Sequence, residues 1–480
     1  RTWEAKMKNR SLNYDVKMSD RCRPCSHLRI SLVSGQTTYT FTDEDILSAQ
    51  KSSDIDPLSR RAPKEDFSFS IFDYSGEYNP SNPSGKWSSM DENAEITVEF
   101  GLEITPGSIE WLPSDIYLLD AKPTVSGGIA TFKASSRLCH LTKTYYKGVY
   151  GSSNLYDLAV SVLTDAGFSS QDYQIDSTLL VMLTNAPIPV DTHLNCLQLI
   201  AHAARCALCT KGDKIVMIPF SSSVVPSDFI VGLDSIELNG DTISKIETLY
   251  KVSANLYVYT PETEDSVLSE VVIDANGETQ CHIEYPLSTN QTITASGGVS
   301  ITDIHTYASA ADFVITGTGA FNVTVVGKKI NTSVSTMESV VSLNTNGSTD
   351  TEKNSLVTSA SMQYALIYHA ANYLQYRLTH NVKYRGNPEL EPLDVIYFAT
   401  VYGSYITGLI LTHTINYNGA ISGTITLKSV SEINESYLYD STGTIVVDSD
   451  EERISLISLT DYQSEYTASE MDDFIEEVFS

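Results

Sequence analysis

Apolar and polar residues alternate along short segments in the N-terminal part of the chain. The alternation is clearest over 67–71 and 94–100. A period of two is typical of strands with one buried face. Short strands at regular spacing predict a small β-barrel or sandwich over 1–142, a domain that includes a basic N-terminal arm. The further predicted strands are 108–112, 115–120 and 129–134, the last two joined by a hairpin turn at Gly127-Gly128.

Residues 30–64 carry three more specific expectations. Two strands are predicted at the start of this segment, around Ile30 and Tyr39. Thr42 or Asp43 is then expected to cap the start of a short helix. The residues that follow, 51–64, are rich in Ser, Asp, Pro and Arg and are expected to form a loop.

The pattern changes to a helical period within 143–232, which is predicted to form an α+β module. Asn154 and Thr192 each precede a segment whose apolar residues recur every three or four positions, and Gly167 follows the first of these segments. Because Asn and Thr are favoured N-cap residues and Gly is favoured just after a helix end, two helices are predicted. The other predicted elements are a strand at 179–183 and a hairpin around Lys211-Gly-Asp213.

The sequence returns to a β-rich composition over 233–352, which is predicted to form a second β domain. Asn354 or Ser355 is predicted to cap a third helix, the first element of a helix-plus-β segment at 353–432. In its last predicted hairpin, Asn418-Gly419 favours a type I′ turn, because both central residues of that turn need positive φ. The strands predicted here are 393–401, 405–415 and 420–429.

The C-terminal residues 433–480 are predicted to form an acidic arm. Residues 436–480 contain twelve acidic residues and one basic residue, Arg453, a composition typical of an extended or disordered tail. A short helix over 471–479 is compatible with the pattern. Taken together, the elements predict a mainly β, multidomain fold with two small β-barrel or sandwich domains, one α+β module and a C-terminal helix plus β-hairpin segment.

Composition and charge narrow the classes of function. The 480 residues are enough for three or four domains. The formal net charge of −29 argues against a nucleic-acid-binding surface, which needs a stripe of basic residues. A negative wall is compatible with a channel through which DNA passes without binding. The same charge also favours solubility. No apolar run long enough for a membrane helix and no secretory signal is found.

Two Cys-x-x-Cys pairs are candidate zinc ligands. They are Cys22 with Cys25 and Cys206 with Cys209, and four thiolates suit tetrahedral zinc. The long separation between the pairs is outside zinc-ribbon spacing, so buried hydrophobic cysteines are the preferred interpretation. Seven cysteines in a chain of this length are expected to stay reduced, as in cytoplasmic assembly.

Other chemical motifs are weaker. The nine His form no His-Glu-x-x-His pair, no Gly-x-Ser-x-Gly elbow occurs, and Gly327-Lys328 lacks the rest of a phosphate loop. We therefore predict no enzymatic activity and no cofactor. Trp87 and Tyr78 are candidate glycan contacts through ring stacking, although packing within the fold is the preferred role of these rings.

The segment 384–423 resembles the C-terminal part of bacteriophage tail-hub proteins. The resemblance is carried by Arg385, Gly386, Asn387 and Pro388, followed by Asp394 and a closing hairpin, and extends more coarsely over 30–430 through the order of domains. Many members have Gly where Leu393 precedes Asp394, so a different turn is expected at that position. The resemblance implies that Arg385, Gly386, Asn387, Pro388 and Asp394 fix a structural turn.

The family implies a structural protein of the virion. It implies a homotrimeric ring at the tail tip or baseplate, assembled in the host cytoplasm, which adapts a hexameric tail tube or distal tail protein to a trimeric spike or fibre. Two β domains per chain give such a ring near six-fold symmetry. The alternative is a receptor- or carbohydrate-binding tail-tip protein, and a tail-associated cell-wall hydrolase has less support because those enzymes usually carry an additional catalytic domain.

Overall fold

The N-terminal strands form a curled sheet around an aromatic core. The computed structural model describes residues 25–429 except 113–114, 221–229, 233–234, 298, 343 and 400–404, together with residues 11, 14, 17 and 18 and two short strands after 429. Phe69 and Phe132 stack inside the sheet with their ring centroids 4.5 Å apart. The strands are β1 (Ser26–Ser34), β2 (Thr37–Phe41), β3 (Ile46–Asp54), β4 (Lys64–Phe72), β5 (Glu95–Thr105), β6 (Ser108–Trp111), β7 (Asp115–Ser126) and β8 (Ile129–Ser135).

The predicted strands and the Gly127-Gly128 hairpin of this region are confirmed. Both glycines have positive φ, 59° and 74°. The short helix predicted after Thr42 is wrong. The Asp45 carboxylate accepts the Thr42 N–H at 3.0 Å, which closes a turn, and Ile46 then starts β3, whose residues pair with β4.

The two helices and the hairpin predicted for the α+β module are confirmed. Asn154 caps α2 by accepting the Asp157 N–H at 2.7 Å, and Thr192 caps α3 by accepting the Asn195 N–H at 3.2 Å. Gly167, with φ of 92°, follows the end of α2. The elements are β9 (Thr144–Tyr145), β10 (Ser153–Asn154), α2 (Leu155–Asp165), β11 (Tyr173–Ile175), the 3-10 helix η1 (Ser177–Val181), β12 (Leu183–Thr184), β13 (Asp191–Thr192), α3 (His193–Ala203), β14 (Cys206–Lys211) and β15 (Lys214–Pro219).

The strand predicted at 179–183 is wrong. The side chain of Asp176 accepts the Thr178 N–H at 2.8 Å and starts η1 instead. Only Leu179 of this helix is buried, whereas Leu180 and Val181 are exposed. A short apolar run does not distinguish a strand from a single helical turn, and here the capping side chain decides between them.

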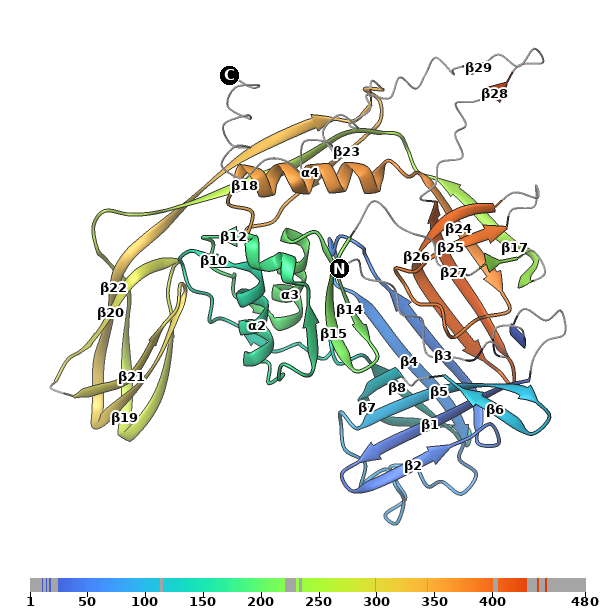
Figure 1. The fold of residues 1–480 in the computed structure, drawn as a ribbon. Helices are drawn as coiled ribbons and strands as arrows, with labels where there is room; N and C mark the ends of the chain where they lie inside the picture. Colours follow the sequence, from blue (N-terminus) through green and yellow to red (C-terminus); the bar gives the residue numbers. More distant parts are fainter. Residues whose placement is uncertain are drawn as a thin grey trace.

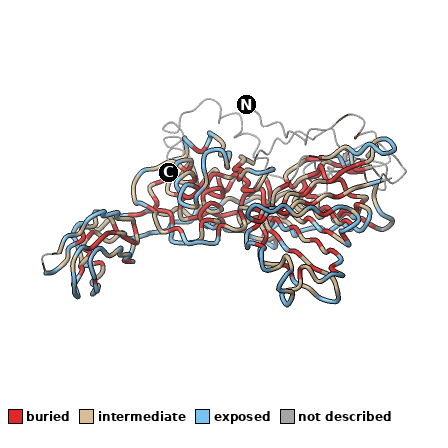
Figure 2. Tube along the Cα trace, turned by 90° about the horizontal axis from the view of Figure 1, so that it is seen from below, coloured by how far each residue is buried: buried red, intermediate tan, exposed pale blue. Residues whose placement is uncertain are grey.

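The middle of the chain contains a long β arm. We define the arm as 266–327, which comprises β19, β20, β21 and the first part of β22, with its own small core around Phe313 and Val325. Figures 1 and 2 show the arm projecting from one end of the molecule. The strands of this region are β16 (Ile230–Val231), β17 (Ile236–Lys245), β18 (Leu249–Pro261), β19 (Ser266–Glu284), β20 (Ser288–Ala295), β21 (Ser300–Thr306), β22 (Ala310–Val340) and β23 (Ser348–Glu352).

The third helix begins later than predicted. Its N-cap is Ser359, which accepts the Met362 N–H at 3.3 Å, and not Asn354 or Ser355. Asn354 is buried and its amide donates to the Leu199 carbonyl at 2.8 Å, so it joins the helix entry to α3. The C-terminal elements are α4 (Ala360–Leu374), β24 (Leu378–Tyr384), β25 (Val395–Ala399), β26 (Tyr405–Tyr417), β27 (Ile421–Ser429), β28 (Leu438–Tyr439) and β29 (Ile445–Val446).

The predicted hairpin between β26 and β27 is confirmed, but its turn is not type I′. Tyr417 pairs with Ile421, which leaves a three-residue loop. Of Asn418 and Gly419, only Gly419 has positive φ, at 73°. Apart from the short strands β28 and β29, the acidic arm predicted at 433–480, including a helix at 471–479, lies outside the described residues.

One sheet joins the two ends of the described chain. β26 pairs with β3 from Thr412 opposite Asp54 to Tyr417 opposite Ala49, so N-terminal and C-terminal strands form a single 14-stranded sheet. Two hydrophobic cores lie along it: one inside β1–β8, and a second formed by β24–β27 with Val231 and Ile236. The fold is thus mainly β with an α+β insertion, and the second compact β unit of the sheet comes from the C-terminal segment rather than from 233–352.

The remaining large core crosses the predicted domain boundaries. It contains both helices of the α+β module, β18, α4 and residues of β25 and β26. Figure 1 shows α4 lying along β18 and β23. Within the described part of the chain, no helix is both long and apolar enough to cross a membrane.

Candidate functional site

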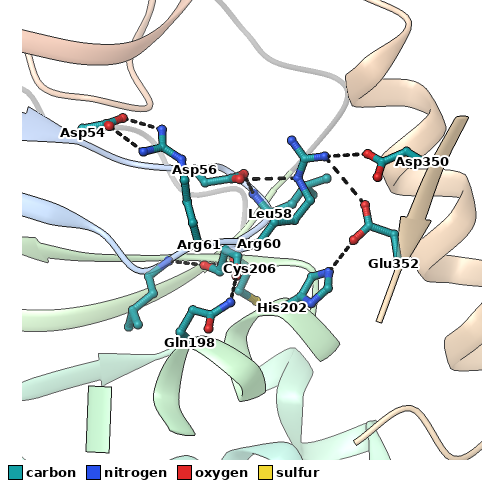
Figure 3. A network of polar contacts seen from close by, with 12 residues as sticks. Asp54, Asp56, Leu58, Arg60, Arg61, Gln198, His202, Cys206, Asp350 and Glu352 are labelled. Atoms are coloured by element: carbon teal, nitrogen blue, oxygen red, sulfur yellow. Dashed lines mark hydrogen bonds and ion pairs between the residues drawn. The ribbon is translucent and has the colours of Figure 1, made fainter. Parts of the chain in front are cut away.

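The loop between β3 and β4 connects three parts of the chain through buried polar contacts. We call this region the junction: residues 55–63, together with the facing side chains of α3, β14 and β23 (Figure 3). The loop prediction for 51–64 is correct from residue 55 onward, because β3 continues to Asp54. The loop is buried at Ile55, Leu58 and Ser59, so it is a packed connector and not a surface loop.

Ser59 binds the loop to the edge of β14. Its hydroxyl donates to the Cys206 carbonyl at 2.7 Å and accepts the Leu208 N–H at 2.9 Å. Its carbonyl accepts the amide of Gln198 on α3. Ser59 has φ of 50°, a conformation that costs a non-glycine residue about 1–2 kcal/mol, and these three hydrogen bonds offset that cost.

Arg60 lies at the centre of the ion pairs in the junction. Its guanidinium lies 3.4 Å from Asp56, 3.0 Å from Asp350 and 3.8 Å from Glu352. Glu352 in turn lies 2.9 Å from His202 Nε2. Burial by itself lowers the pKa of Arg60, but the carboxylates of Asp56 and Glu352 raise it above its ordinary value. The cluster thus connects the N-terminal sheet, the α+β module and β23.

A buried lysine of β27 approaches the same cluster. Lys428 Nζ lies 3.7 Å from the ring centroid of Tyr373 on α4, and the guanidinium of Arg60 lies 5.5 Å from the same ring. Burial and the positive charge of Arg60 lower the pKa of Lys428 to about 8. Two cations share one aromatic ring here, an arrangement that stabilises them through the negative ring face.

The segment 384–394 forms two consecutive turns against the β26–β27 hairpin. Gly386 has φ of 82°, and a Cβ built there would lie 2.6 Å from Ile421 Cγ2 and 2.8 Å from the backbone of Ser422. Only glycine fits that approach. The Leu390 N–H donates to the Asn387 carbonyl at 3.2 Å, with Pro388 at the second turn position, where its fixed φ is favoured.

The other resemblance residues of this segment also make local contacts. Asn387 is buried and its side-chain oxygen accepts the Glu389 N–H at 3.0 Å. The Asp394 carboxylate accepts the Glu391 N–H at 2.8 Å and closes the second turn. The Arg385 N–H donates to the Ser235 carbonyl at 2.9 Å. These contacts suit a structural turn.

A buried relay fixes the first turn to β26. His413 Nδ1 lies 2.7 Å from the Leu390 carbonyl, which only accepts, so this nitrogen carries the proton. His413 Nε2 then accepts the Tyr384 hydroxyl at 2.8 Å, and the Tyr384 oxygen accepts the Asn387 N–H at 3.0 Å. Burial raises the pKa of Tyr384, so its hydroxyl keeps its proton at ordinary pH.

Leu393 lies in the left-handed region of backbone conformation, which glycine favours. Its φ is 76°, and the turn that differs from the one in tail hubs stays a prediction. The Leu393 side chain packs on the small cluster of Ile55, Ala207, Cys209 and Val216. The side chain thus connects the 384–394 segment to the junction loop and to the α+β module.

Replacing Leu393 with glycine is expected to lower the free energy of unfolding by about 1 kcal/mol. Glycine adopts the left-handed conformation without strain, which stabilises the folded chain by about 1–2 kcal/mol. Loss of the packed Leu393 side chain destabilises it by about 2–3 kcal/mol. Urea unfolding measures the difference. Leu393→Ala is the control: it keeps the strained backbone and loses the packing, so it should be less stable than Leu393→Gly. A glycine variant more stable than the natural chain would contradict the packing role.

A small polar cavity lies where the sheet, the module and the 384–394 segment meet. Its volume is about 30 Å³, and its walls include Lys51, Glu65, Thr210 and Glu391. Such a space holds about one or two water molecules. Lys51 lies 2.5 Å from Asp115; burial lowers its pKa, but that carboxylate raises it above the ordinary value. The cavity fits buried water and is too small for an organic substrate.

Two of the four candidate cysteines lie in separate hydrophobic clusters. Cys206 and Cys209 are both buried, but they belong to two different hydrophobic clusters of β14, and burial raises the pKa of each thiol to about 12. Thiols held protonated are poor metal ligands. Cys25 is exposed, and Cys22 lies outside the described residues. In the described residues, no group of three or more His, Cys, Asp or Glu side chains is placed to hold a metal ion.

The candidate glycan contacts are packed within the N-terminal unit. Tyr78 is buried against Phe132, with ring centroids 5.4 Å apart. Trp87 is partly buried; its indole N–H donates to the Pro123 carbonyl at 3.1 Å, and Lys122 lies over its ring. The exposed aromatic pair of this region is Phe72 and Tyr74, whose rings stack at 5.2 Å.

The residues of the junction were missed by the sequence interpretation. Arg60, Glu352, His202 and Lys428 lie far apart in the chain, and no local motif relates them. One signal was present: the loop contains apolar Ile55 and Leu58 among its charges, which favours a buried connector over a solvated one.

Comparisons with known proteins give similarity of structure only. No protein-family model matches the chain, and no curated protein matches its sequence. The 43 kDa tail protein of prophage MuSo2 from Shewanella oneidensis matches 84% of this chain and 98% of its own length, with 11% identity and a TM-score of 0.46. Prophage tail protein gp18 from Listeria monocytogenes EGD-e matches 84% of this chain and 95% of its own length, with 9% identity and a TM-score of 0.46.

The Francisella PdpA-VgrG complex also contains a similar chain. The match covers 88% of this chain and 55% of that chain, with 10% identity and a TM-score of 0.42. By name, these neighbours are tail proteins and a VgrG complex. At identities near 10% they assign no function to this chain.

Proposed function

We propose that the chain is a structural tail-hub protein of a phage tail tip or baseplate. Three copies form a ring that adapts a hexameric tail tube or distal tail protein to a trimeric spike or fibre. The ring has no catalytic role and no cofactor, and it belongs to the virion after assembly in the host cytoplasm. DNA passes through its lumen without specific binding, because the chain carries a formal net charge of −29.

One observation carries this proposal. Two compact β units lie along the same sheet, one from β1–β8 and one from β24–β27, and β3–β26 pairing joins them directly. Three copies of such a chain present six β units, which is the number that a six-fold tube needs from a three-fold ring. The 384–423 segment that resembles tail hubs supplies most of the second unit.

The junction suits a part that must hold its shape under assembly. Its ion pairs and hydrogen bonds connect the β3–β4 loop to α3, β14 and β23. Buried polar contacts of this kind favour one relative arrangement of the connected parts, because any other arrangement leaves charges unpaired. A fixed arrangement of the two β units is what symmetry matching requires.

The native mass of the purified chain tests the trimer. We expect a particle three times the 52.7 kDa chain mass by native mass spectrometry or light scattering. A monomer at every concentration reached would contradict a self-assembling ring. The alternative, a receptor- or carbohydrate-binding tail-tip protein, is favoured by the exposed stacked pair Phe72 and Tyr74; glycan binding by a monomer, lost in Tyr74→Ala, would support it instead.

A further inference from the structure

A surface patch on the α+β module combines exposed apolar side chains with an arginine. Leu180, Val181 and Leu183 are 46%, 80% and 57% exposed. The guanidinium of Arg205 reaches Met182, between Val181 and Leu183 in the chain, and lies 3.8 Å from its Sδ. We call these four side chains (180, 181, 183 and 205) the Arg205 patch. Apolar groups gathered around an arginine are typical of binding hot spots.

Arg205 has an unfavourable backbone conformation, and no carboxylate of the described residues pairs with its guanidinium. It follows α3 with φ of 56°, at the left-handed position that glycine usually occupies. Within the described part of the chain, its guanidinium makes no ion pair, and Met182 Sδ is its one hydrogen-bond acceptor. Burial lowers its pKa. In a chain with 60 acidic residues, a partly buried arginine without a carboxylate offers a favourable position for an anionic side chain.

A second unsatisfied group lies beside Arg205. Nδ1 of His369 on α4 is buried and has no hydrogen-bond partner within the described structure. Burial and the charge of Arg205 lower the pKa of His369 to about 4, so this ring is neutral at pH 7. Arg205 is therefore the cation of this surface, and its complement is an acidic group with apolar neighbours.

The C-terminal sequence of the chain has that chemistry. Residues 471–480 read Met-Asp-Asp-Phe-Ile-Glu-Glu-Val-Phe-Ser. At helical spacing, Phe474, Val478 and neighbouring apolar residues share one side, and the four carboxylates flank it. The alternative complement is a carboxylate from a second copy, but the position at which the described core ends favours the same chain.

A series of contacts links the end of β27 to the patch. Lys428, next to the end of β27, contacts Tyr373, whose ring centroid is 5.7 Å from that of Phe220. The Phe220 N–H donates to the Arg205 carbonyl at 3.1 Å. Three successive contacts therefore connect Lys428 with Arg205. The length of the C-terminal segment is ample, because an extended chain spans roughly 3.3 Å per residue.

We propose that residues 471–480 dock on the Arg205 patch of the same chain, with an acidic side chain paired to Arg205 and apolar side chains on Leu180, Val181 and Leu183. The docked segment satisfies the guanidinium with a charge-assisted hydrogen bond. It also covers apolar surface that otherwise favours self-association of the free chain. In this proposal the acidic arm has a defined binding site on the core.

A photo-crosslinking residue at position 181 of the full chain tests whether residues 471–480 bind at this site. We expect irradiation to join position 181 to a peptide within 471–480, in a product with the mass of one chain. Arg205→Gln should reduce the yield about tenfold, because one charge-assisted hydrogen bond is lost. Arg205→Lys, which keeps the charge, should reduce it less. The same probe at Tyr74, on the N-terminal unit, should not capture 471–480.

A second variant keeps the test independent of folding. Phe474→Asp lies outside the described core, so it should lower the crosslink yield at position 181 without changing the unfolding midpoint. A crosslink between two chains would overturn the proposal in favour of a second copy. A crosslink to another part of the same chain, or no crosslink in the natural sequence, would also overturn it. None of these outcomes depends on whether the chain forms a trimeric ring.

Discussion

Replacing Arg60 with methionine is expected to lower the free energy of unfolding by about 3 kcal/mol. The substitution leaves the buried carboxylates of Asp56 and Glu352 without their cation. Removing one partner of a buried ion pair costs about 3–5 kcal/mol, and the partial exposure of Arg60 places the expected loss at the lower end. The midpoint of urea unfolding, followed by circular dichroism, measures it.

The neighbouring arginine provides a matched control. Arg61 makes a two-point contact with Asp54 at 2.5 Å and 2.6 Å, but its side chain is 51% exposed. Arg61→Met should therefore cost about 0–1 kcal/mol. Adding Glu352→Gln to Arg60→Met should recover part of the loss. Equal effects of Arg60→Met and Arg61→Met would show that the junction is not held by its buried charges.

Replacing Gly386 with alanine is expected to cost a similar amount, about 3 kcal/mol. The left-handed conformation contributes about 1–2 kcal/mol. The new Cβ also meets Ile421 and the backbone of Ser422 at 2.6 Å and 2.8 Å, and overpacking of this kind costs about 1–3 kcal/mol. The β26–β27 hairpin must shift to admit it, so amide hydrogen exchange at 421–423 should rise along with the loss of stability.

Gly419 separates the two causes. Its φ of 73° is close to that of Gly386, but a Cβ there meets nothing within 4 Å. Gly419→Ala should therefore cost about 1–2 kcal/mol, the backbone part alone. If both alanine variants lose the same stability, then the close approach of the 384–394 segment to the hairpin contributes nothing.

The sequence predicted elements well where one side chain decides the local backbone. Asn154, Thr192 and Gly127-Gly128 are caps and turns whose effect acts within three residues, so they are readable without the fold. The errors at 42–47 and 179–183 have the same origin. There the side chains of Asp45 and Asp176 each accept a nearby backbone N–H, which favours a turn in one case and a 3-10 helix in the other. The pattern of apolar residues alone does not predict these hydrogen bonds.

The candidate site could be predicted only in part from the sequence. The turn residues Arg385–Pro388 and Asp394 were predicted from a contiguous motif, and the structure places them in two adjacent turns. Arg60, Glu352 and Lys428 come from three distant segments, and their proximity depends on β3–β26 pairing and on the position of α4. Strands more than 350 residues apart pair because of the whole fold, so no local sequence pattern predicts that pairing.

The length of β22 has a mechanical consequence. The strand runs for 31 residues, roughly 100 Å at the usual rise per residue. Its first part pairs with β19 in the arm and its last part pairs with β18, against which α4 packs. No loop interrupts it, so a load on the tip of the arm bends a continuous beam and does not turn a hinge. We therefore expect a displacement of the arm tip to be felt at the strand that packs under α4.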